Sequence, residues 1–373
     1  MKFLALLLLL LGCQKPQKVA PDLSWEIQEN KYAQHFSIAK SADLWRLQAL
    51  SPWKNSLDTF TYYLSHSAKS LNSFPPEQQV VIPLKKTAAM STNYIPWYQA
   101  LKIENTLYGV ETIKLISSSF AIERFEQGQL IELGSVANIQ GEQLIQHKLD
   151  AMFLYGISNH IKQELTQIKK SQTPLFLLGT HQETHPLGQL EWIKFFSHFF
   201  SKSDLADSIF NDIEIKYNQQ KNTLVNNNRP QPNILLGAPW KGDWYVAGGK
   251  SYMAQYIKDA GGHYVYESLK INSNKPYSFE EVYFKNKEAN FWLHPSSHHS
   301  LSSLKLQDNR FVNFSAFQQQ NVWNNNKKTN STGGNDWFES AASNPHLVLK
   351  ELQALFYPTQ FPDHKFVWYQ QLK

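Results

Sequence analysis

One long amphipathic helix near the middle of the chain constrains the fold more than any other feature. Residues 201–225 begin with Ser203 as a helix cap, carry acidic residues in the first turn and place lysines toward the end. Their apolar residues recur at every fourth position: Leu205, Ile209, Ile213 and Tyr217. This pattern predicts a helix roughly 33 Å long, which the polar run 226–232 ends. A helix of this length divides the chain into two units.

Before this helix, short apolar runs alternate with helix-length segments. Continuous apolar runs are typical of buried parallel strands. A helix is predicted over 158–170, where Ser158 caps the helix and apolar residues share one face. The alternation predicts a parallel sheet with crossover helices. The apolar runs occupy residues 78–84, 106–110, 150–156 and 174–179.

After the long helix the same alternation begins again. A helix over 251–260 has Ser251 as its cap and Gly261-Gly262 as its stop. Residues 318–336 are predicted to form a long polar loop, and a final helix is predicted over 344–358. The strand segments are 233–237, 244–249, 263–266 and 289–294.

An N-terminal extension has a different pattern. Residues 25–64 alternate polar and apolar residues in short bursts, which predicts antiparallel strands. The sequence therefore predicts an α/β protein of two Rossmann-like lobes with parallel-rich sheets, joined by one helix and preceded by this strand extension. The expected boundaries are 25–200 for the first lobe with its extension, 201–228 for the bridging helix and 229–373 for the second lobe.

The first residues resemble a bacterial lipoprotein signal. Residues 3–11 form an apolar run much shorter than the roughly 20 residues of a membrane-spanning helix. Leu10-Leu11-Gly12-Cys13 resembles a lipobox, which implies removal of residues 1–12, lipidation of Cys13 and a tether over 13–24. The alternative is an ordinary secretory signal with an incidental cysteine. Since no other run approaches membrane length, we expect attachment to a membrane of the bacterial cell envelope through the lipid alone.

Composition excludes some classes of partner and site. Cys13 is the only cysteine, so neither a disulfide nor a cysteine metal site can form within the chain. The net charge is +5, but the lysines are scattered and no basic stripe occurs. We therefore expect no nucleic-acid partner.

Several stretches together resemble the periplasmic binding proteins for ferric siderophores, haem and vitamin B12, which deliver ligands to ABC importers. The similar stretches are 83–110, 132–156, 244–267 and 276–295, in that order. The resemblance implies a monomeric binding protein rather than an enzyme, with no cofactor of its own. It also implies an ABC permease and its ATPase as partners, and a small-molecule metal complex as the ligand. Cobalamin is the alternative to an iron complex.

In open α/β sheets, ligands bind outside the carboxyl ends of the strands. The candidate ligand-binding residues in the loops there are Thr87, Tyr94, Tyr155 and His181 in the first lobe and Trp240, Trp244, Tyr245 and His294 in the second. Aromatic rings in the second-lobe loops would stack on a flat macrocycle. Alternatively, these rings close the core.

The charged and metal-binding residue types narrow the expected ligand. The chain has four arginines, Arg46, Arg124, Arg229 and Arg310, none of which lies in a predicted cleft loop. A neutral hydroxamate chelate, haem or cobalamin is therefore favoured over a strongly anionic siderophore. The related zinc and manganese binding proteins carry a histidine in the loop after the first parallel strand, whereas this chain has "KKTAAMST" there. We accordingly expect no site for a bare metal ion.

Two glutamates match the family's permease-docking positions. They are Glu142 and Glu280, with Glu281 as an alternative to the second. Without the resemblance, each would be interpreted as a solvated helix carboxylate.

Two other functions compete with ligand capture. A secreted hydrolase would use residues such as Asp243, Glu183 and His181, but no Gly-x-Ser-x-Gly or His-Glu-x-x-His motif occurs. A purely structural surface protein is the other alternative.

Overall fold

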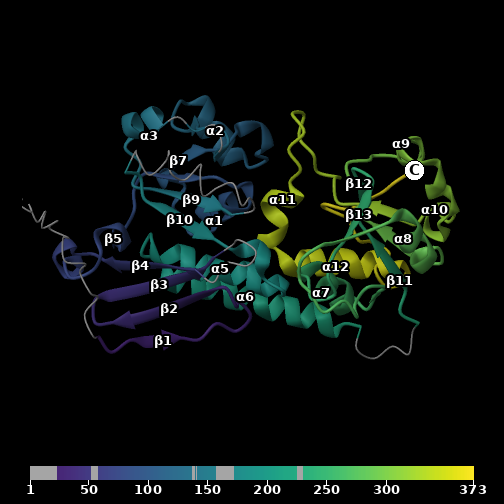
Figure 1. Cartoon of the computed structure of the whole chain (residues 1–373), viewed down its shortest axis with the longest axis horizontal. Helices are drawn as coiled ribbons and strands as arrows, with labels where there is room; N and C mark the ends of the chain where they lie inside the picture. Colours follow the sequence, from purple (N-terminus) through teal and green to yellow (C-terminus); the bar gives the residue numbers. More distant parts are fainter. Residues whose placement is uncertain (1–22, 52–57, 137–138, 140, 157–171, 225–229) are drawn as a thin grey trace, which may run out of the picture.

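The computed structural model describes residues 23–51, 58–136, 139, 141–156, 172–224 and 230–373. Two α/β lobes lie side by side, and an additional sheet covers one side of the first lobe (Figure 1). The expected α/β class with two parallel-rich sheets and an antiparallel extension is confirmed. The helix predicted over 158–170 and the lipidation site Cys13 lie outside the described residues.

The first lobe is built on a five-stranded parallel sheet of order β10-β9-β6-β7-β8. Its central strands are apolar along their length because helices or the extension cover both faces. The strands are β6 (Thr87–Ala89), β7 (Leu107–Val110), β8 (Ile131–Glu132), β9 (Ala151–Tyr155) and β10 (Leu175–Leu178). The helices are α1 (Ile95–Ala100), α2 (Ser119–Glu126), α3 (Gly141–His147) and α5 (Pro186–His198).

The N-terminal extension forms its own five-stranded sheet in sequential order. Its first three pairings are antiparallel and the last is parallel. The strands are β1 (Glu26–Gln28), β2 (Phe36–Ser41), β3 (Leu44–Leu50), β4 (Thr59–Ser65) and β5 (Gln79–Val81). The prediction that residues 78–84 begin the parallel sheet of the lobe is wrong, because β5 pairs with β4. Val80 and Ile82 are nevertheless buried in the core shared by the extension and the lobe, which explains their apolar character.

Two buried carboxylates attach the extension to the first lobe. Glu191 on α5 accepts hydrogen bonds from the backbone N–H groups of residues 31–33 at 2.8–2.9 Å. Glu183 accepts from the N–H groups of residues 34–35 at 2.9 and 3.1 Å and from Nε1 of Trp192 at 2.9 Å. Buried carboxylates persist only when hydrogen bonds replace their lost hydration. The extension is therefore an integral part of the first lobe.

The predicted long helix is present as α6 (Ser203–Asn222). Its 20 residues span about 30 Å, and it packs against α5 of the first lobe and α12 (Pro345–Phe356) of the second. Tyr217 donates a hydrogen bond to Asp259 at 2.8 Å, and Lys221 pairs with the same carboxylate at 2.9 Å. The helix thus holds both lobes along its length (Figure 1). The expected boundary at residue 228 lies outside the described residues.

The second lobe contains a sheet of order β14-β11-β16-β17-β18, parallel except for its last pair. The strands are β11 (Asn233–Leu236), β14 (His263–Tyr264), β16 (Phe291–Leu293), β17 (Val322–Asn324) and β18 (Gln370–Gln371). Residues 318–336 were predicted as one polar loop, but they contain β17. Asn324 is fully buried there, and its amide donates to the carbonyls of Ser296 and His298 at 2.8 Å. Val322 and Trp323 are the only apolar residues between polar residues 318–321 and 324–328, so the apolar run is too short to predict a strand.

A small antiparallel sheet extends the second lobe. It consists of β12 (Pro239–Trp240), β13 (Asp243–Val246) and β15 (Lys275–Tyr277). The sequence suggested that residues 244–249 are a strand of the parallel sheet of the second lobe. This prediction is wrong, because β13 belongs to the small antiparallel sheet. The remaining helices are α7 (Tyr252–Asp259), α8 (Phe279–Asn286), α9 (Leu301–Gln307), α10 (Ser315–Gln318) and α11 (Trp337–Ser340). In the described part of the chain, none of the helices is both long and apolar enough to cross a membrane.

Candidate functional site

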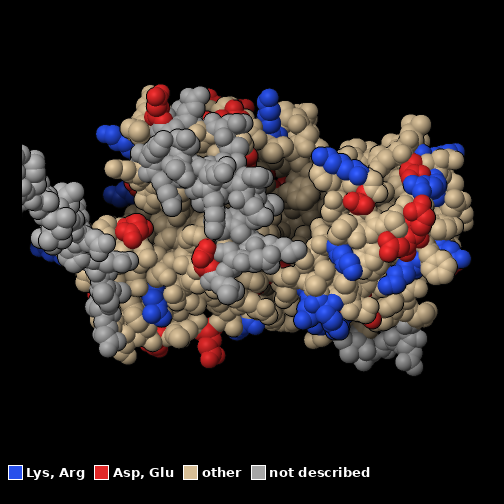
Figure 2. Space-filling view, viewed as in Figure 1, with Lys and Arg blue, Asp and Glu red and all other residues tan. Residues whose placement is uncertain are grey.

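A small cavity lies where the two lobes meet, at the carboxyl ends of β9 and β10. Its volume is about 100 Å³, and the molecular surface is hollowed between the lobes (Figure 2). Among the described residues that line the cavity, none is acidic, lysine or arginine. The first lobe contributes Asn93, Tyr155, Thr180, His181 and Gln189, and the second contributes Tyr252, Tyr256, Trp337, Phe338, Ala341 and Ala342.

Two polar atoms in this lining are buried without a hydrogen-bond partner in the described structure. They are Oδ1 of Asn93 and Nδ1 of His181. The amide nitrogen of Asn93 donates to the Thr180 hydroxyl at 3.4 Å, which leaves the amide oxygen available. Since buried polar atoms normally have a partner, these two atoms are suited to meet a bound molecule.

The environment of His181 keeps its imidazole neutral. Burial, together with a smaller effect of nearby His35, lowers the pKa of His181 to about 4. The ring of Tyr155 meets the imidazole edge-on, with centroids 4.5 Å apart. A neutral imidazole with a free nitrogen can accept a hydrogen bond or bind a metal.

Aromatic side chains form the rest of the cavity wall. Burial raises the pKa values of Tyr155, Tyr252 and Tyr256, so their hydroxyls stay protonated. Trp337 is almost fully buried, whereas Phe338 is 64% exposed and lies at the cavity mouth. This wall offers flat apolar surface together with hydroxyl groups.

Of the four residues predicted in the first lobe, Tyr155 and His181 line the cavity. Tyr94 is fully buried behind it, and its hydroxyl donates to the carbonyls of β9 and β10. Thr87 is also buried, because it belongs to β6 rather than to a loop, and its hydroxyl bonds with Tyr98 at 2.8 Å. Tyr94 therefore lies behind the wall, whereas Thr87 lies at the amino end of β6, and neither residue lines the cavity.

Of the three aromatic residues predicted in the second lobe, Trp244 requires a correction. It is fully buried, and its Nε1 donates to the carbonyl of Leu236 at 3.1 Å. The turn between β12 and β13 folds it back onto the core. Trp240 and Tyr245 are exposed by 61% and 40%, but they pack on each other outside the cavity lining.

His294 lies one layer behind the cavity. Its Nε2 shares a hydrogen bond of 2.7 Å with the Tyr369 hydroxyl, and its ring lies 5.2 Å from that of Trp337. Burial lowers the pKa of His294 to about 3. The His294 imidazole is therefore neutral, and it packs against the ring of Trp337.

The two glutamates predicted to dock a permease are both exposed and lie on different lobes. Glu142 is in the first turn of α3, and Glu280 is in the first turn of α8 (Figure 1). Glu280 accepts a hydrogen bond from Arg310 at 2.8 Å, and Arg310 also pairs with Asp308. Glu281 caps its own helix through Ser278.

The residues suggested for a hydrolase do not come together. The Glu183 carboxylate accepts hydrogen bonds from the backbone of the extension. Asp243 is an exposed residue of the β12–β13 hairpin. In the described chain, no group of three or more histidine, cysteine or acidic residues is arranged to hold a metal ion.

Several cavity residues had no signal in the sequence analysis. Asn93 directly precedes the candidate residue Tyr94 but was not itself selected. Tyr252 and Tyr256 belong to α7, for which the sequence predicted a helix but no role in the site. Trp337 and Phe338 follow the segment predicted as a polar loop. Their proximity to the first lobe arises from tertiary contacts, which no local pattern contains.

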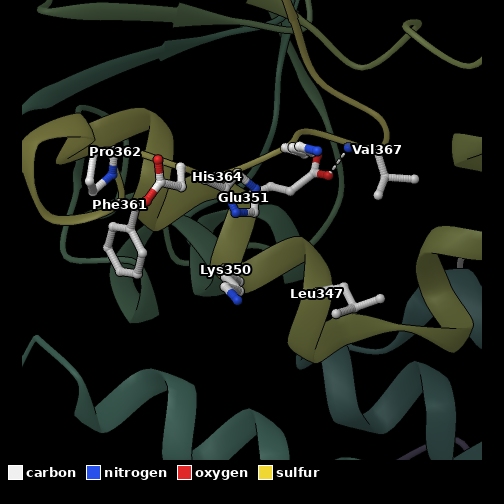
Figure 3. Close-up of a pocket in the computed structure, with 9 residues that line it drawn as sticks. Leu347, Lys350, Glu351, Phe361, Pro362, His364 and Val367 are labelled. Atoms are coloured by element: carbon white, nitrogen blue, oxygen red, sulfur yellow. Dashed lines mark hydrogen bonds between the residues drawn. The ribbon is translucent and has the colours of Figure 1, made fainter.

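A larger cavity of about 550 Å³ lies between α12 and residues 361–367 (Figure 3). The Glu351 carboxylate points back to the chain and accepts hydrogen bonds from the backbone N–H groups of residues 367–369. The Glu351 carboxylate thus maintains the fold. All the residues that line this cavity belong to the second lobe.

No protein-family model matches this chain. A possible iron-binding periplasmic protein from Staphylococcus epidermidis superposes with a TM-score of 0.58 and 12% identity, covering 74% of this chain and 100% of that protein. A periplasmic haem-binding protein from Pseudomonas aeruginosa gives 0.56 and 17%, covering 74% and 94%. A periplasmic vitamin B12 binding protein of Vibrio cholerae gives 0.51 and 13%, covering 74% and 98%.

Similarity by sequence extends to lipoproteins of Methanocaldococcus jannaschii. One uncharacterised lipoprotein is 22% identical over 298 residues, which are 76% of this chain and 68% of that protein. A second is 23% identical over 256 residues, 64% of this chain and 63% of that protein, so less than two thirds of its length is matched. The chain therefore has the fold of the periplasmic solute-binding proteins, whose solved examples here are binding proteins rather than enzymes.

Proposed function

We propose that this protein is the substrate-binding lipoprotein of an ABC importer and captures an iron complex, either a ferric siderophore or haem. The observation that carries the proposal is the interlobe cavity, where unpaired atoms of His181 and Asn93 face an aromatic wall. A flat or aromatic ligand would gain apolar contact from that wall. The two polar atoms would fix its orientation or reach its metal.

The charge of the lining favours a ligand that is close to neutral. A strongly anionic chelate needs cationic groups at its site, and the described lining offers none. Haem, whose carboxylates can remain at the cavity mouth, and a neutral hydroxamate chelate satisfy this condition. Cobalamin satisfies it as well and is the alternative ligand, which accords with the vitamin B12 binding protein among the structural neighbours.

The remaining parts of the proposal concern delivery. Lipidated Cys13 would anchor the protein, as a monomer, to an envelope membrane, which accords with lipoproteins among its sequence relatives. Glu142 and Glu280 would dock the two lobes on a permease that works with an ATPase. Because both carboxylates lie on helices outside the cavity, docking and ligand capture would use separate surfaces.

Absorption spectroscopy tests the proposal directly. The purified protein is mixed with haemin, a ferric hydroxamate siderophore or cyanocobalamin, and is separated from free compound by gel filtration. We expect one of these chromophores to be retained at one equivalent. His181→Ala should weaken its binding by about tenfold or more through the lost polar contact, while His263→Ala, on an exposed histidine, serves as the control. Elution of all three compounds apart from the protein would refute the proposal.

A further inference from the structure

One segment of the second lobe reaches across to the first. Residues 328–340, here called the strap, leave the sheet after β17, turn back at a hairpin and end in α11. The hairpin is closed by a bridge between Thr329 and Asn335, and its turn contains Gly333 at a φ of 94°. Figure 1 shows the hairpin rising beside the first lobe, with α11 at the junction between the lobes.

The tip of the strap binds the first lobe through backbone carbonyls. The amide nitrogen of Asn330 donates to the carbonyls of Lys114 and Ile116 at 3.1 and 3.0 Å. The hydroxyl of Thr332 donates to the Lys114 carbonyl at 2.6 Å. Gly334 approaches so closely that a Cβ atom there would lie 2.7 Å from the Leu115 carbonyl. The tip therefore fits this part of the first lobe closely.

The α11 end of the strap makes a second attachment. Glu339 is buried and accepts a hydrogen bond from the backbone N–H of Ser117 at 2.5 Å. The Thr92 hydroxyl donates to the carbonyl of Phe338 at 3.1 Å. At the root of the strap, buried Asp336 accepts from Nε1 of Trp368 at 2.9 Å, which fixes the root to the second lobe.

The strap also determines the size of the interlobe cavity. Trp337 and Phe338 form part of its wall, and Ala341 and Ala342 directly follow them. Ligand sites for small molecules typically measure about 300–1,000 Å³, whereas this cavity measures about 100 Å³. A metal complex therefore fits only after this wall has moved.

We infer that the strap is a lid, which must leave the first lobe before a ligand enters the interlobe cavity. This inference rests on the proposed function. The attachments to the first lobe are a few hydrogen bonds, made by the exposed Thr332, the partly buried Asn330 and Thr92, and the buried Glu339. The root, in contrast, is buried against Trp368. Individual hydrogen bonds of this kind contribute little net stability. The tip and the exposed Phe338 of α11 therefore release more easily than the root, where Trp337 packs on Trp368 and Tyr369. The strap then swings while α6 keeps the lobes together.

Two measurements on the full chain test the lid. Hydrogen–deuterium exchange over residues 113–118 reports its release, because the amide of Ser117 is bonded to Glu339. The rate at which diethyl pyrocarbonate modifies His181, followed by peptide mass spectrometry, reports access to the cavity. The test variant is Asn330→Ala/Thr332→Val, which removes the three hydrogen bonds from the tip to the first lobe. It also removes the bonds that Oδ1 of Asn330 accepts within the tip from Thr332 and Gly334. The control is Ser331→Ala, which alters an exposed residue at the same tip.

We expect hydrogen–deuterium exchange over residues 113–118 to become at least about tenfold faster in the double variant. The modification of His181 should also become several-fold faster, because the cavity opens each time the strap leaves the first lobe. Both rates should be unchanged in the control. Unchanged exchange in the double variant would overturn the inference. Faster exchange with unaltered His181 modification would also overturn it, because the strap would then brace the lobes without controlling access.

The lid and the proposed function fail in different ways. If haemin, a ferric hydroxamate and cyanocobalamin all fail to bind while His181 modification still responds to the double variant, the proposed function is wrong and the lid remains. If one of them binds while neither rate responds, the lid is wrong and the function remains.

Discussion

Replacing Trp244 by alanine tests whether this ring belongs to the core. The side chain is fully buried among aromatic rings, of which that of Trp292 is 5.7 Å away. Removing a buried tryptophan costs about 3–5 kcal/mol, and the carbonyl of Leu236 also loses its indole donor. We therefore expect the upper half of this range. With a urea dependence of about 3 kcal/mol/M, the unfolding midpoint should fall by roughly 1.3–1.7 M.

Far-UV circular dichroism provides the assay, since the signal does not depend on the tryptophan removed. Trp240→Ala is the matched control, because that ring is 61% exposed, and its cost should stay within about 0.5 kcal/mol. Trp244→Phe should restore part of the loss by refilling the cavity. Equal midpoints for Trp244→Ala and Trp240→Ala would refute the core assignment. So would a Trp244→Ala protein that unfolds normally but binds ligand less tightly.

Glu191→Gln weakens a buried acceptor for three backbone N–H groups, so it should lower the unfolding free energy by about 2–4 kcal/mol in denaturant titrations. An unchanged midpoint would contradict the role of this carboxylate. Cys13→Ala should move the protein from the membrane to the soluble fraction, as followed by immunoblotting; retention in membranes would exclude the lipid anchor. Charge reversal at Glu142 and Glu280 should abolish uptake by cells while purified protein keeps its ligand affinity; reduced affinity would place these residues elsewhere. Burial raises the pKa of Glu339, beside charged Asp336 and Lys328, to about 7 from 4.5. Protonation therefore favours the docked strap, and this contribution is lost as pH rises through about 7. Exchange over 113–118, corrected for its intrinsic rate, should increase between about pH 5 and 8 in the natural chain but not in Glu339→Gln.

The sequence predicted those parts of the fold whose signal is local. The helix α6 was recognisable because its apolar residues keep one spacing from Leu205 to Tyr217. The strands β9 and β10 were recognisable because both faces of each strand are buried. Partner strands were less predictable. β5 has the same apolar character as a parallel strand of the lobe, yet it pairs with the extension. β17 was missed because it has only two apolar residues within a polar run, and its third residue, Asn324, is buried only because its amide bonds inside the lobe.

For the site, position along the chain was a better guide than residue type. Tyr155 is the last residue of β9 and His181 lies three residues after the end of β10, and both line the cavity. Trp244 was selected for its aromatic ring, but a two-residue turn reverses the chain and points that ring inward. The contributions of Tyr256 and Phe338 depend on how the two lobes approach each other, which no stretch of sequence encodes by itself.

The carboxylate attachment of the extension also affects the order in which the protein can fold. The amides of residues 31–35 are made early, but their acceptors Glu183 and Glu191 lie 148 to 160 residues downstream. At about 5–20 residues per second, a ribosome needs roughly 7–30 s to add this stretch. The strands β2 to β4 can pair in that interval through local contacts, but they have no surface on which to dock. A segment that is synthesised before the rest of the lobe is therefore among the last to reach its final place, and it docks only on a first lobe whose α5 is already formed.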